Sequence, residues 1–130
     1  MATWQDVQRV ASRLPEVTEE PPDKPTVGWR VKGKTFVWER PLRKRDLAEL
    51  GDAAPDGPVL GAYVPDEHAK RALISERPDV YFTTSHFDGY GVVLARLERL
   101  PLDELEELAG EAWLVRAPKT LAKKYTEQTR

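Results

Sequence analysis

Between Val27 and Arg40, apolar and polar residues alternate on both sides of the dipeptide Gly33-Lys34, and this pattern constrains the fold more than any other part of the chain. A two-residue Gly-X loop of this kind favours a type II′ turn between antiparallel strands. Pairing outward from that turn gathers apolar side chains on one face. The predicted pairs are Val31 opposite Phe36 and Trp29 opposite Trp38 on the apolar face, with Arg30 opposite Val37 on the other face. The segment therefore predicts a β-hairpin that packs its aromatic face on a core.

The rest of the chain divides into short helical and extended segments. Thr3 and Asp6 form a capping pattern ahead of an apolar stripe that ends at Leu14. The further predicted helices span Leu42–Leu50, Pro65 to the residue before Pro78, Pro101 to Pro118, and Lys119–Gln128. The further predicted strands span Val59–Val64, Val80–Thr84 and Val92–Leu97, and the predicted surface connections are Glu16–Pro25 and Gly51–Pro58. Short hairpins and helices with one apolar stripe predict an α+β fold, with a largely antiparallel sheet of about five strands and helices on one face.

Helical spacing also predicts which side chains face the core. The inward residues of the helix after Pro65 are Ala69, Ala72 and Leu73. Those of the helix that starts at Pro101 are Leu102, Leu105, Leu108, Ala109, Ala112 and Trp113. All four tryptophans (Trp4, Trp29, Trp38 and Trp113) fit predicted core faces, so none of them indicates base stacking.

Length and composition place the chain in a broad class. The chain has 130 residues, of which 40% are hydrophobic and 32% are charged. This length and composition suit a single globular domain over residues 1–130. The absence of cysteine excludes disulfides, thiolate metal sites and cysteine nucleophiles. No apolar run approaches the roughly 20 residues that span a bilayer, and the charged start does not resemble a signal peptide. We therefore expect a cytoplasmic monomer with no membrane segment.

Ser85, His86 and Asp88 are the residue types of a hydrolase triad, but their spacing argues against one. Side chains this close within a turn diverge, whereas a triad needs a linear relay assembled from distant segments. Asp88 followed by Gly89 is typical of a turn, and His86 of a half-buried ring that bonds loop backbone groups. The other histidine is His68, and the spacing of the two suits no metal site. We predict no catalytic residues, no metal and no cofactor, hence a protein that is not an enzyme.

Basic residues gather in the predicted hairpin and directly after it. The candidate nucleic-acid-binding residues are Arg30, Lys32, Lys34, Arg43, Lys44 and Arg45. A β-ribbon with basic side chains at its tip can lie along a phosphate backbone, and Arg40 and the bases that follow it continue the patch. The same pattern is also typical of edge strands, where lysine serves solubility and blocks pairing with other chains. Both interpretations stay open on the sequence.

The run from Val80 to Leu97, with its His-Phe-Asp-Gly-Tyr loop, resembles the MmcQ/YjbR family. The stretches that extend this resemblance over nearly the whole chain are the first helix with Trp4 and Val7, the turn Lys32-Gly33-Lys34, Phe36-Val37, Glu111-Ala-Trp and Arg116-Ala-Pro-Lys. The resemblance implies a frataxin-like α/β sandwich and a bacterial-type, double-wing DNA-binding protein, and it brings no catalytic residues. The two wings would be Val27–Arg40 and Val80–Leu97. Only the first is markedly basic, because no lysine or arginine lies between Thr83 and Val93.

These observations support two hypotheses. The first is a non-enzymatic binding module that contacts DNA through the basic hairpin, neutralising phosphates with little base recognition. The alternative is a module for a small ligand or a protein partner, centred on the loop Ser85–Tyr90. The residues that converge there are Ser85, His86, Asp88 and Tyr90.

Overall fold

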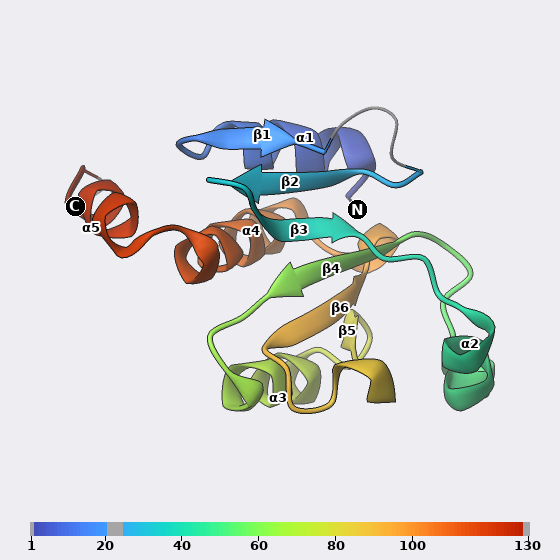
Figure 1. Ribbon diagram of the computed structural model, residues 1–130. Coiled ribbons are helices and arrows are strands. Elements are labelled where there is room, and N and C mark those ends of the chain that lie inside the picture. Colours follow the sequence, from blue (N-terminus) through green and yellow to red (C-terminus); the bar gives the residue numbers. More distant parts are fainter. Residues whose placement is uncertain (1, 21–24, 129–130) are drawn as a thin grey trace.

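The computed structural model describes residues 2–20 and 25–128, and its centre is an antiparallel sheet (Figure 1). The six strands follow the order β1-β2-β3-β4-β6-β5. They are β1 Val17–Glu19, β2 Gly28–Val31, β3 Lys34–Glu39, β4 Val59–Tyr63, β5 Tyr81–Phe82 and β6 Val92–Arg96. The helices are α1 Trp4–Ser12, α2 Lys44–Leu50, α3 Glu67–Glu76, α4 Leu102–Arg116 and α5 Lys119–Gln128, with short 3-10 turns η1 Gly51–Ala53, η2 Ser85–Phe87 and η3 Leu97–Arg99. The predicted α+β class and antiparallel sheet are confirmed.

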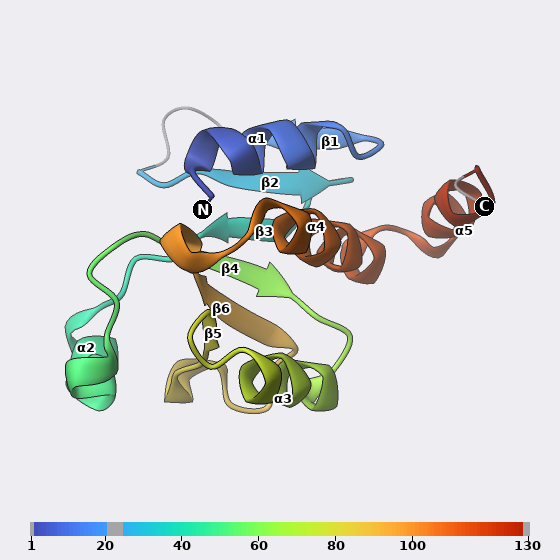
Figure 2. The ribbon, with the colours of Figure 1, turned by 180° about the vertical axis from the view of Figure 1, so that it is seen from behind.

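Helices α1 and α4 cover one face of the sheet and enclose the main core (Figure 2). Its fully buried side chains include Leu60, Ala62, Val93 and Ala95 from the sheet and Leu105, Ala112 and Trp113 from α4. Each large apolar side chain removed from water stabilises the fold by about 1.5–3 kcal/mol. The indole N–H of Trp113 donates to the carbonyl oxygen of Pro15 at 3.0 Å, so its polar atom is satisfied inside the core. After Pro118, α5 packs Tyr125 against the same indole, with 4.9 Å between ring centroids.

Helix α1 begins as its sequence predicts. The Thr3 hydroxyl accepts from the Asp6 N–H at 3.2 Å, and the Asp6 carboxylate accepts from the Thr3 N–H at 2.9 Å. This reciprocal pair is a capping box, and it satisfies backbone groups that the first turn leaves free. The helix then buries Val7, Val10 and Ala11 against the core.

The predicted hairpin forms, but its predicted turn and register are wrong. The loop residues are Lys32 and Gly33, whose φ angles of 50° and 82° fit a type I′ turn. The observed pairs are Gly28 with Trp38, Trp29 with Val37, Arg30 with Thr35 and Val31 with Lys34. Between the second and third pairs β3 advances two residues while β2 advances one, so Phe36 is the extra residue of a β-bulge. The bulge buries both Phe36 and Val37, and it places Trp38 on the opposite face of the sheet from Trp29.

The stretch Glu16–Pro25, predicted as a surface connection, contains the edge strand β1. Val17 pairs with Val31 and Glu19 with Trp29, which adds a sixth strand to the sheet. Residues 21–24 of this stretch lie outside the described residues. The strand is only three residues long and two of them are polar, so it carries no alternation that a sequence pattern could detect.

Helix α3 begins within its predicted segment, capped by Asp66, but turns a different side inward. The Asp66 carboxylate accepts from the Ala69 N–H at 2.8 Å. Ala69 and Leu73 are half-buried as expected, whereas Ala72 is exposed and Lys70 is fully buried. Polar backbone groups lie beneath this helix and require a donor, which apolar spacing does not reveal. In the same way Leu102, expected on the inner stripe of α4, is 42% exposed in its first turn.

Helix α2 packs over a second, smaller apolar cluster. Leu42 and Leu50 contact Val59, Phe82 and Leu94 there. Successive residues of a strand point to opposite faces, so this cluster lies on the side of the sheet away from α1 and α4. It covers the β4-β6-β5 part of the sheet. In Figure 1 no described helix crosses in front of β2 and β3, whose outer face is open.

Candidate functional site

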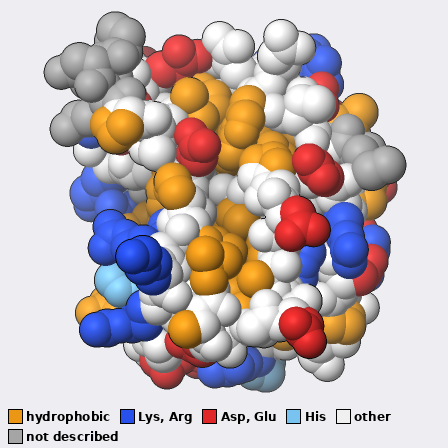
Figure 3. Space-filling model, turned by 90° about the vertical axis from the view of Figure 1, so that its right-hand side faces the viewer, with side chains coloured by type: hydrophobic (Ala, Val, Ile, Leu, Met, Phe, Trp, Pro, Cys, Tyr) orange, Lys and Arg blue, Asp and Glu red, His pale blue; other side chains and the backbone are white. Residues whose placement is uncertain are grey.

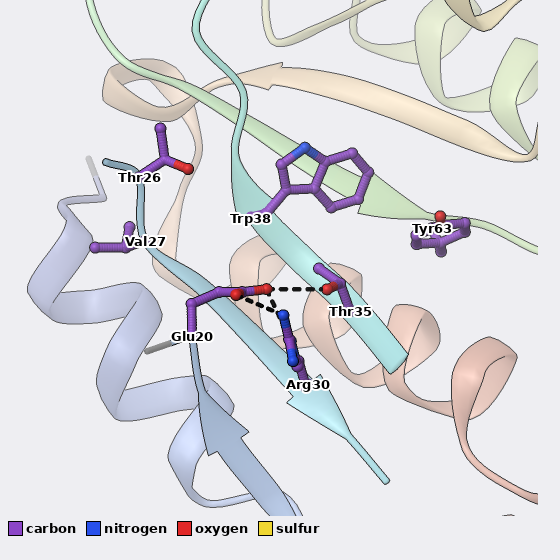
Figure 4. A pocket seen from close by; sticks show the side chains of 7 residues that line it. All are labelled: Glu20, Thr26, Val27, Arg30, Thr35, Trp38 and Tyr63. Carbon is purple, nitrogen blue, oxygen red and sulfur yellow. Dashed lines mark hydrogen bonds and ion pairs between the residues drawn. The ribbon is translucent and has the colours of Figure 1, made fainter. Parts of the chain in front are cut away.

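The outer face of β2, β3 and β4 holds a pocket of about 380 Å³, called here the open-face pocket. Its walls come from three strands, from Glu20 directly after β1, and from Thr26 and Val27 directly before β2 (Figure 4). The lining residues are Glu20, Thr26, Val27, Arg30, Thr35, Trp38 and Tyr63. Arg30 is the one predicted site residue among them, so the other residues of this pocket were not predicted from the sequence.

Trp38 forms the aromatic wall of the open-face pocket. It pairs directly with Gly61 of β4, and its indole ring lies across that glycine. A Cβ at position 61 would lie 2.7 Å from the ring, so only glycine allows this placement. Tyr63 lies two residues further along β4, with 5.4 Å between the two ring centroids. Two neighbouring strands thus present two half-buried aromatic rings on a sheet face that no described helix covers.

Arg116 fixes Tyr63 from the end of α4. Its guanidinium lies 4.2 Å from the centroid of the Tyr63 ring, within cation–π range. Its Nε donates to the carbonyl oxygen of Thr35 at 3.0 Å. The β3–β4 pairs run only from Val37–Ala62 to Glu39–Leu60, so this carbonyl lies beyond them and takes the arginine as its donor. The tyrosine ring is therefore held in place by a side chain from the far layer.

A polar network borders the two rings. Arg30 donates to both carboxylate oxygens of Glu20, at 2.9 and 2.7 Å, and the Thr35 hydroxyl donates to the same carboxylate at 3.2 Å. Figure 4 shows these contacts beneath the Trp38 indole. The Arg30 side chain keeps 34% of its surface exposed despite the ion pair. The network fixes the shape of the pocket and leaves about a third of the Arg30 side chain accessible.

The six predicted nucleic-acid-binding residues do not form one cluster. Lys32 and Lys34 are exposed at the hairpin turn, where Lys32 pairs with Glu16 at 2.9 Å. The other three, Arg43, Lys44 and Arg45, are exposed on and just before α2. The turn and α2 lie at opposite ends of β3 (Figure 1). Arg30 lies between these two groups, in the open-face pocket.

Arg40, predicted to continue the basic surface, is buried instead. It pairs with Asp46 at 3.3 Å, and both side chains are at most 10% exposed. Burial raises the pKa of Asp46, but the hydrogen bond from the Arg43 N–H and the charge of Arg40 outweigh it, so the net pKa lies below its usual value. The pair anchors the start of α2 to the end of β3.

The loop Ser85–Tyr90 presents its candidate residues to solvent. Ser85, His86, Asp88 and Tyr90 are all exposed, Tyr90 by 63%. The Ser85 hydroxyl donates to Glu49 of α2 at 2.6 Å, while the His86 ring packs edge-on against Phe87 with 4.8 Å between centroids. The serine is thus engaged with a glutamate from another element. The half-buried ring predicted for His86 is wrong, and the predicted turn at Asp88-Gly89 forms, with a φ of 82° at the glycine.

A buried lysine holds this loop from below. The Lys70 ammonium donates to the carbonyl oxygens of Phe87 and Tyr90, at 2.8 and 3.0 Å, and pairs with Glu67 at 3.1 Å. Its hydrogen bond lowers the pKa of Glu67. Gly91 directly follows the loop, and its backbone lies close to the segment before α3. A Cβ at this position would lie 2.6 Å from the Val64 carbonyl oxygen. Lys70 was not predicted because apolar spacing pointed to Ala69, Ala72 and Leu73 as the inward residues of this helix.

Helix α2 and this loop form one continuous surface. Besides the bond between Glu49 and Ser85, the Arg40 guanidinium lies 5.3 Å from the centroid of the Phe87 ring. On the side of the molecule where α2 lies, Figure 3 shows Lys and Arg side chains gathered around a histidine. The basic residues that the second predicted wing lacks are therefore supplied next to it by α2.

The described residues include no group of three His, Asp or Glu side chains placed to hold a metal ion. Within the same part of the chain, every helix is too short or too polar to cross a membrane.

Comparison with known proteins identifies the family. The YjbR family profile matches residues 12–115. Uncharacterized proteins of Mycobacterium bovis and Mycobacterium tuberculosis are 48% identical over 128 residues, which cover 96% of this chain and 96% of theirs. The crystal structure of the Deinococcus radiodurans protein DR2400, with a DUF419 domain, is similar in fold, with a TM-score of 0.67 at 21% identity over 97% of this chain and 89% of that one. The resemblance found in the sequence is confirmed, and the chain belongs to the YjbR, or MmcQ/YjbR, family.

Proposed function

We propose that this protein is a non-enzymatic module that binds single-stranded nucleic acid on the open face of its sheet. The observation that carries the proposal is the position of Trp38, which lies half-buried across Gly61 beside Tyr63, on a sheet face that no described helix covers. Bases of any sequence can stack on such rings, because every base has a π-face. A sheet that displays aromatic rings from neighbouring strands is a known platform for single strands.

The charges around the pocket suit an extended phosphate backbone. Lys32 and Lys34 lie at one end of β3, and Arg43, Lys44 and Arg45 lie at the other. The strand has six residues, which separates the two groups by roughly 20 Å. A strand laid between them would place phosphates near both groups and bases over Trp38. Phosphate neutralisation then supplies affinity without base recognition.

This proposal changes how the double-wing, DNA-binding expectation applies here. Two basic hairpins would grip a duplex, but the loop Ser85–Tyr90 carries no lysine or arginine, and its neighbouring bases come from α2. A single strand across the sheet uses the hairpin turn, the aromatic rings and α2 together. We further propose that the protein acts as a cytoplasmic monomer, in line with its lack of cysteine.

Fluorescence anisotropy with labelled strands of about 12 nucleotides, within the usual site sizes of single-strand-binding domains, tests the proposal. Thymidine and uridine strands and a duplex of equal length separate DNA, RNA and duplex binding. The affinity should fall with salt at a log–log slope of about −0.7 per neutralised phosphate. Trp38→Ala should weaken binding by about 5- to 150-fold through lost stacking.

Tyr90→Ala is the matched control, because Tyr90 is an exposed aromatic residue outside the pocket. It should bind within about twofold of the parent, since an exposed contact outside the site contributes little. No binding at low salt, or equal losses for both variants, would reject the open-face site. Stronger binding to the duplex than to either single strand would reject single-strand preference.

A second candidate is a small-ligand or protein-partner site at Ser85–Tyr90. One observation favours it: Lys70 fixes two loop carbonyls from below, so exposed side chains stand on a rigid base. A thermal-shift screen would test this candidate. A ligand that raises the melting temperature of the parent but not of His86→Ala supports it, provided that both melt alike without ligand. If His86→Ala only lowers the melting temperature, the histidine is structural.

A further inference from the structure

On the helix side of the molecule, a groove of about 500 Å³ lies between α3 and α4. Figure 2 shows these two helices on the same side of the sheet. The floor is apolar and is formed by Val64, Leu73, Tyr81 and Leu108. On the α3 side the wall is low, because Ala72 presents only a methyl group and is exposed. The groove shares no lining residue with the open-face pocket.

Glutamates border this groove and give it a net negative charge. They are Glu76, Glu104, Glu107 and Glu111. Arg77 neutralises Glu104, which also accepts from the Tyr81 hydroxyl at 3.3 Å. Burial and then the charge of Glu104 raise the pKa of Tyr81, so that hydroxyl stays protonated. For the other three glutamates no ion pair is found among residues 2–20 and 25–128.

We infer that this groove is a docking site for a basic amphipathic helix of a partner protein. The partner's apolar face would cover Leu73 and Leu108, and its Lys or Arg side chains would pair with the glutamates of α4. This mode places an amphipathic helix in a groove with anchors about one turn apart. Charge complementarity selects a basic partner over an acidic one.

The spacing of the glutamates favours a helix over a small cation. Arg77 already neutralises Glu104, so the glutamates left for a partner are Glu107 and Glu111 of α4 and Glu76 of α3. Glu107 and Glu111 follow at i and i+4, about 6 Å apart along one side of α4, and Glu76 comes from the other helix. A single ammonium group reaches only part of this spread of charge. Lys or Arg residues repeated along a helix match the whole row.

A second copy of this chain offers no suitable helix. Its basic helix α5 exposes Lys119, Lys123 and Lys124. However, the apolar residues Leu121 and Tyr125 already pack against the core of their own chain. The apolar face that the groove requires is therefore not free on α5. The other basic helix, α2, exposes Leu47 but has only 7 residues, about two turns, which is too short to follow the groove, so the occupant is a different protein.

The test uses a synthetic helical peptide of about four turns, with leucine along one face and lysine beside it, binding to the full chain. Nuclear magnetic resonance shifts should map to α3 and α4, and a peptide with glutamate for lysine should not bind. The double variant E107K/E111K should weaken binding by about tenfold or more, because two attractions become repulsions. The control D103K/E106K makes the same charge change on exposed residues of α4 outside the groove and should bind within about twofold.

The variant Ala72→Trp adds an independent test, because the position is exposed and the larger side chain fills the groove. It should abolish peptide binding while the protein keeps its parent melting temperature. Equal weakening by both double variants would show nonspecific charge attraction and overturn the inference. Hexylamine tests the alternative of a small cation with an apolar tail. Binding of hexylamine but not of the peptide would overturn the inference, and so would resonance shifts confined to elements other than α3 and α4.

Discussion

The indole ring of Trp38 lies across Gly61, its direct partner in the neighbouring strand, and no other residue at position 61 leaves room for it. This relationship keeps an aromatic ring on the outer face of the sheet. It links a single glycine of β4 to the proposed binding surface, and it leads to the first prediction.

Gly61→Ala should destabilise the protein by about 1–3 kcal/mol, because the new methyl group must displace the ring. The same change should weaken oligonucleotide binding, since Trp38 leaves its position. Urea unfolding and anisotropy measure the two effects. Gly110→Ala is the control, because its added Cβ meets nothing within 4 Å beyond its chain neighbours and the backbone of its own helix α4. This control should gain about 0.5–1 kcal/mol from helix propensity. A Gly61→Ala protein as stable as the parent would contradict the predicted clash.

Lys70→Met should destabilise the protein by about 2–4 kcal/mol, because two loop carbonyls lose their donor in a buried site. Methionine keeps most of the volume, so the loss reports on hydrogen bonds rather than packing. Hydrogen exchange should increase at Phe87–Tyr90. Arg71→Met removes an exposed partner of the same Glu67 and should cost under about 1 kcal/mol. Equal costs for both variants would show that the buried ammonium is not the anchor of the loop.

The type I′ turn predicts different effects of the same substitution at Lys32 and at Lys34. Lys32 has a φ of 50°, a conformation that asparagine adopts more easily than lysine, whereas Lys34 is the first residue of β3. Lys32→Asn should stabilise the protein by about 0.5–1 kcal/mol, measured by urea unfolding. Both proteins in this comparison carry Glu16→Gln, which removes the ion pair between Glu16 and Lys32. Lys34→Asn in the same background should give no gain, because asparagine is unfavourable in strands. A larger gain in stability from Lys34→Asn than from Lys32→Asn would support the predicted II′ turn instead.

Stability should depend on pH through Asp46. Its folded pKa lies below the usual 3.8, so the unfolded chain binds the proton more readily. The carboxylate therefore stabilises the fold above about pH 4, and this contribution is lost as the pH falls through the folded pKa. Asp46→Asn should cost about 3 kcal/mol or more near pH 7, because Arg40 stays buried without its partner.

The cost of Asp46→Asn should shrink when urea unfolding is repeated near pH 3. Asp52→Asn, at an exposed position, should change stability by less than about 0.5 kcal/mol at both pH values. An unchanged cost for Asp46→Asn at low pH would show that its charge is not the stabilising feature.

Local patterns predicted the elements well because their causes lie close together in the sequence. The capping box of α1 needs only Thr3 and Asp6, and the hairpin needs only a glycine between two apolar runs. The bulge at Phe36 does not follow from alternation, because two consecutive buried residues break the period of two. That one extra residue moved Trp38 from the predicted core face to the outer face.

The candidate site was harder to predict because its parts meet only through tertiary contacts. Tyr63 depends on Arg116 from α4, and Glu20 meets Arg30 across strands. Lys70 was not among the predicted inward residues of α3, because its acceptors, Phe87 and Tyr90, lie 17 and 20 residues further along the chain. A lysine on the inner side of a helix is a signal that could have indicated buried backbone acceptors.

The most direct measurement follows the four tryptophan indole N–H signals while a thymidine strand of about 12 nucleotides is added at low salt. We predict that the Trp38 signal shifts most, together with Tyr63 ring signals, while buried Trp29 and Trp113 stay nearly unchanged. An unchanged Trp38 signal at saturating oligonucleotide, with the largest shifts instead in Ser85–Tyr90, would contradict binding on the open face of the sheet.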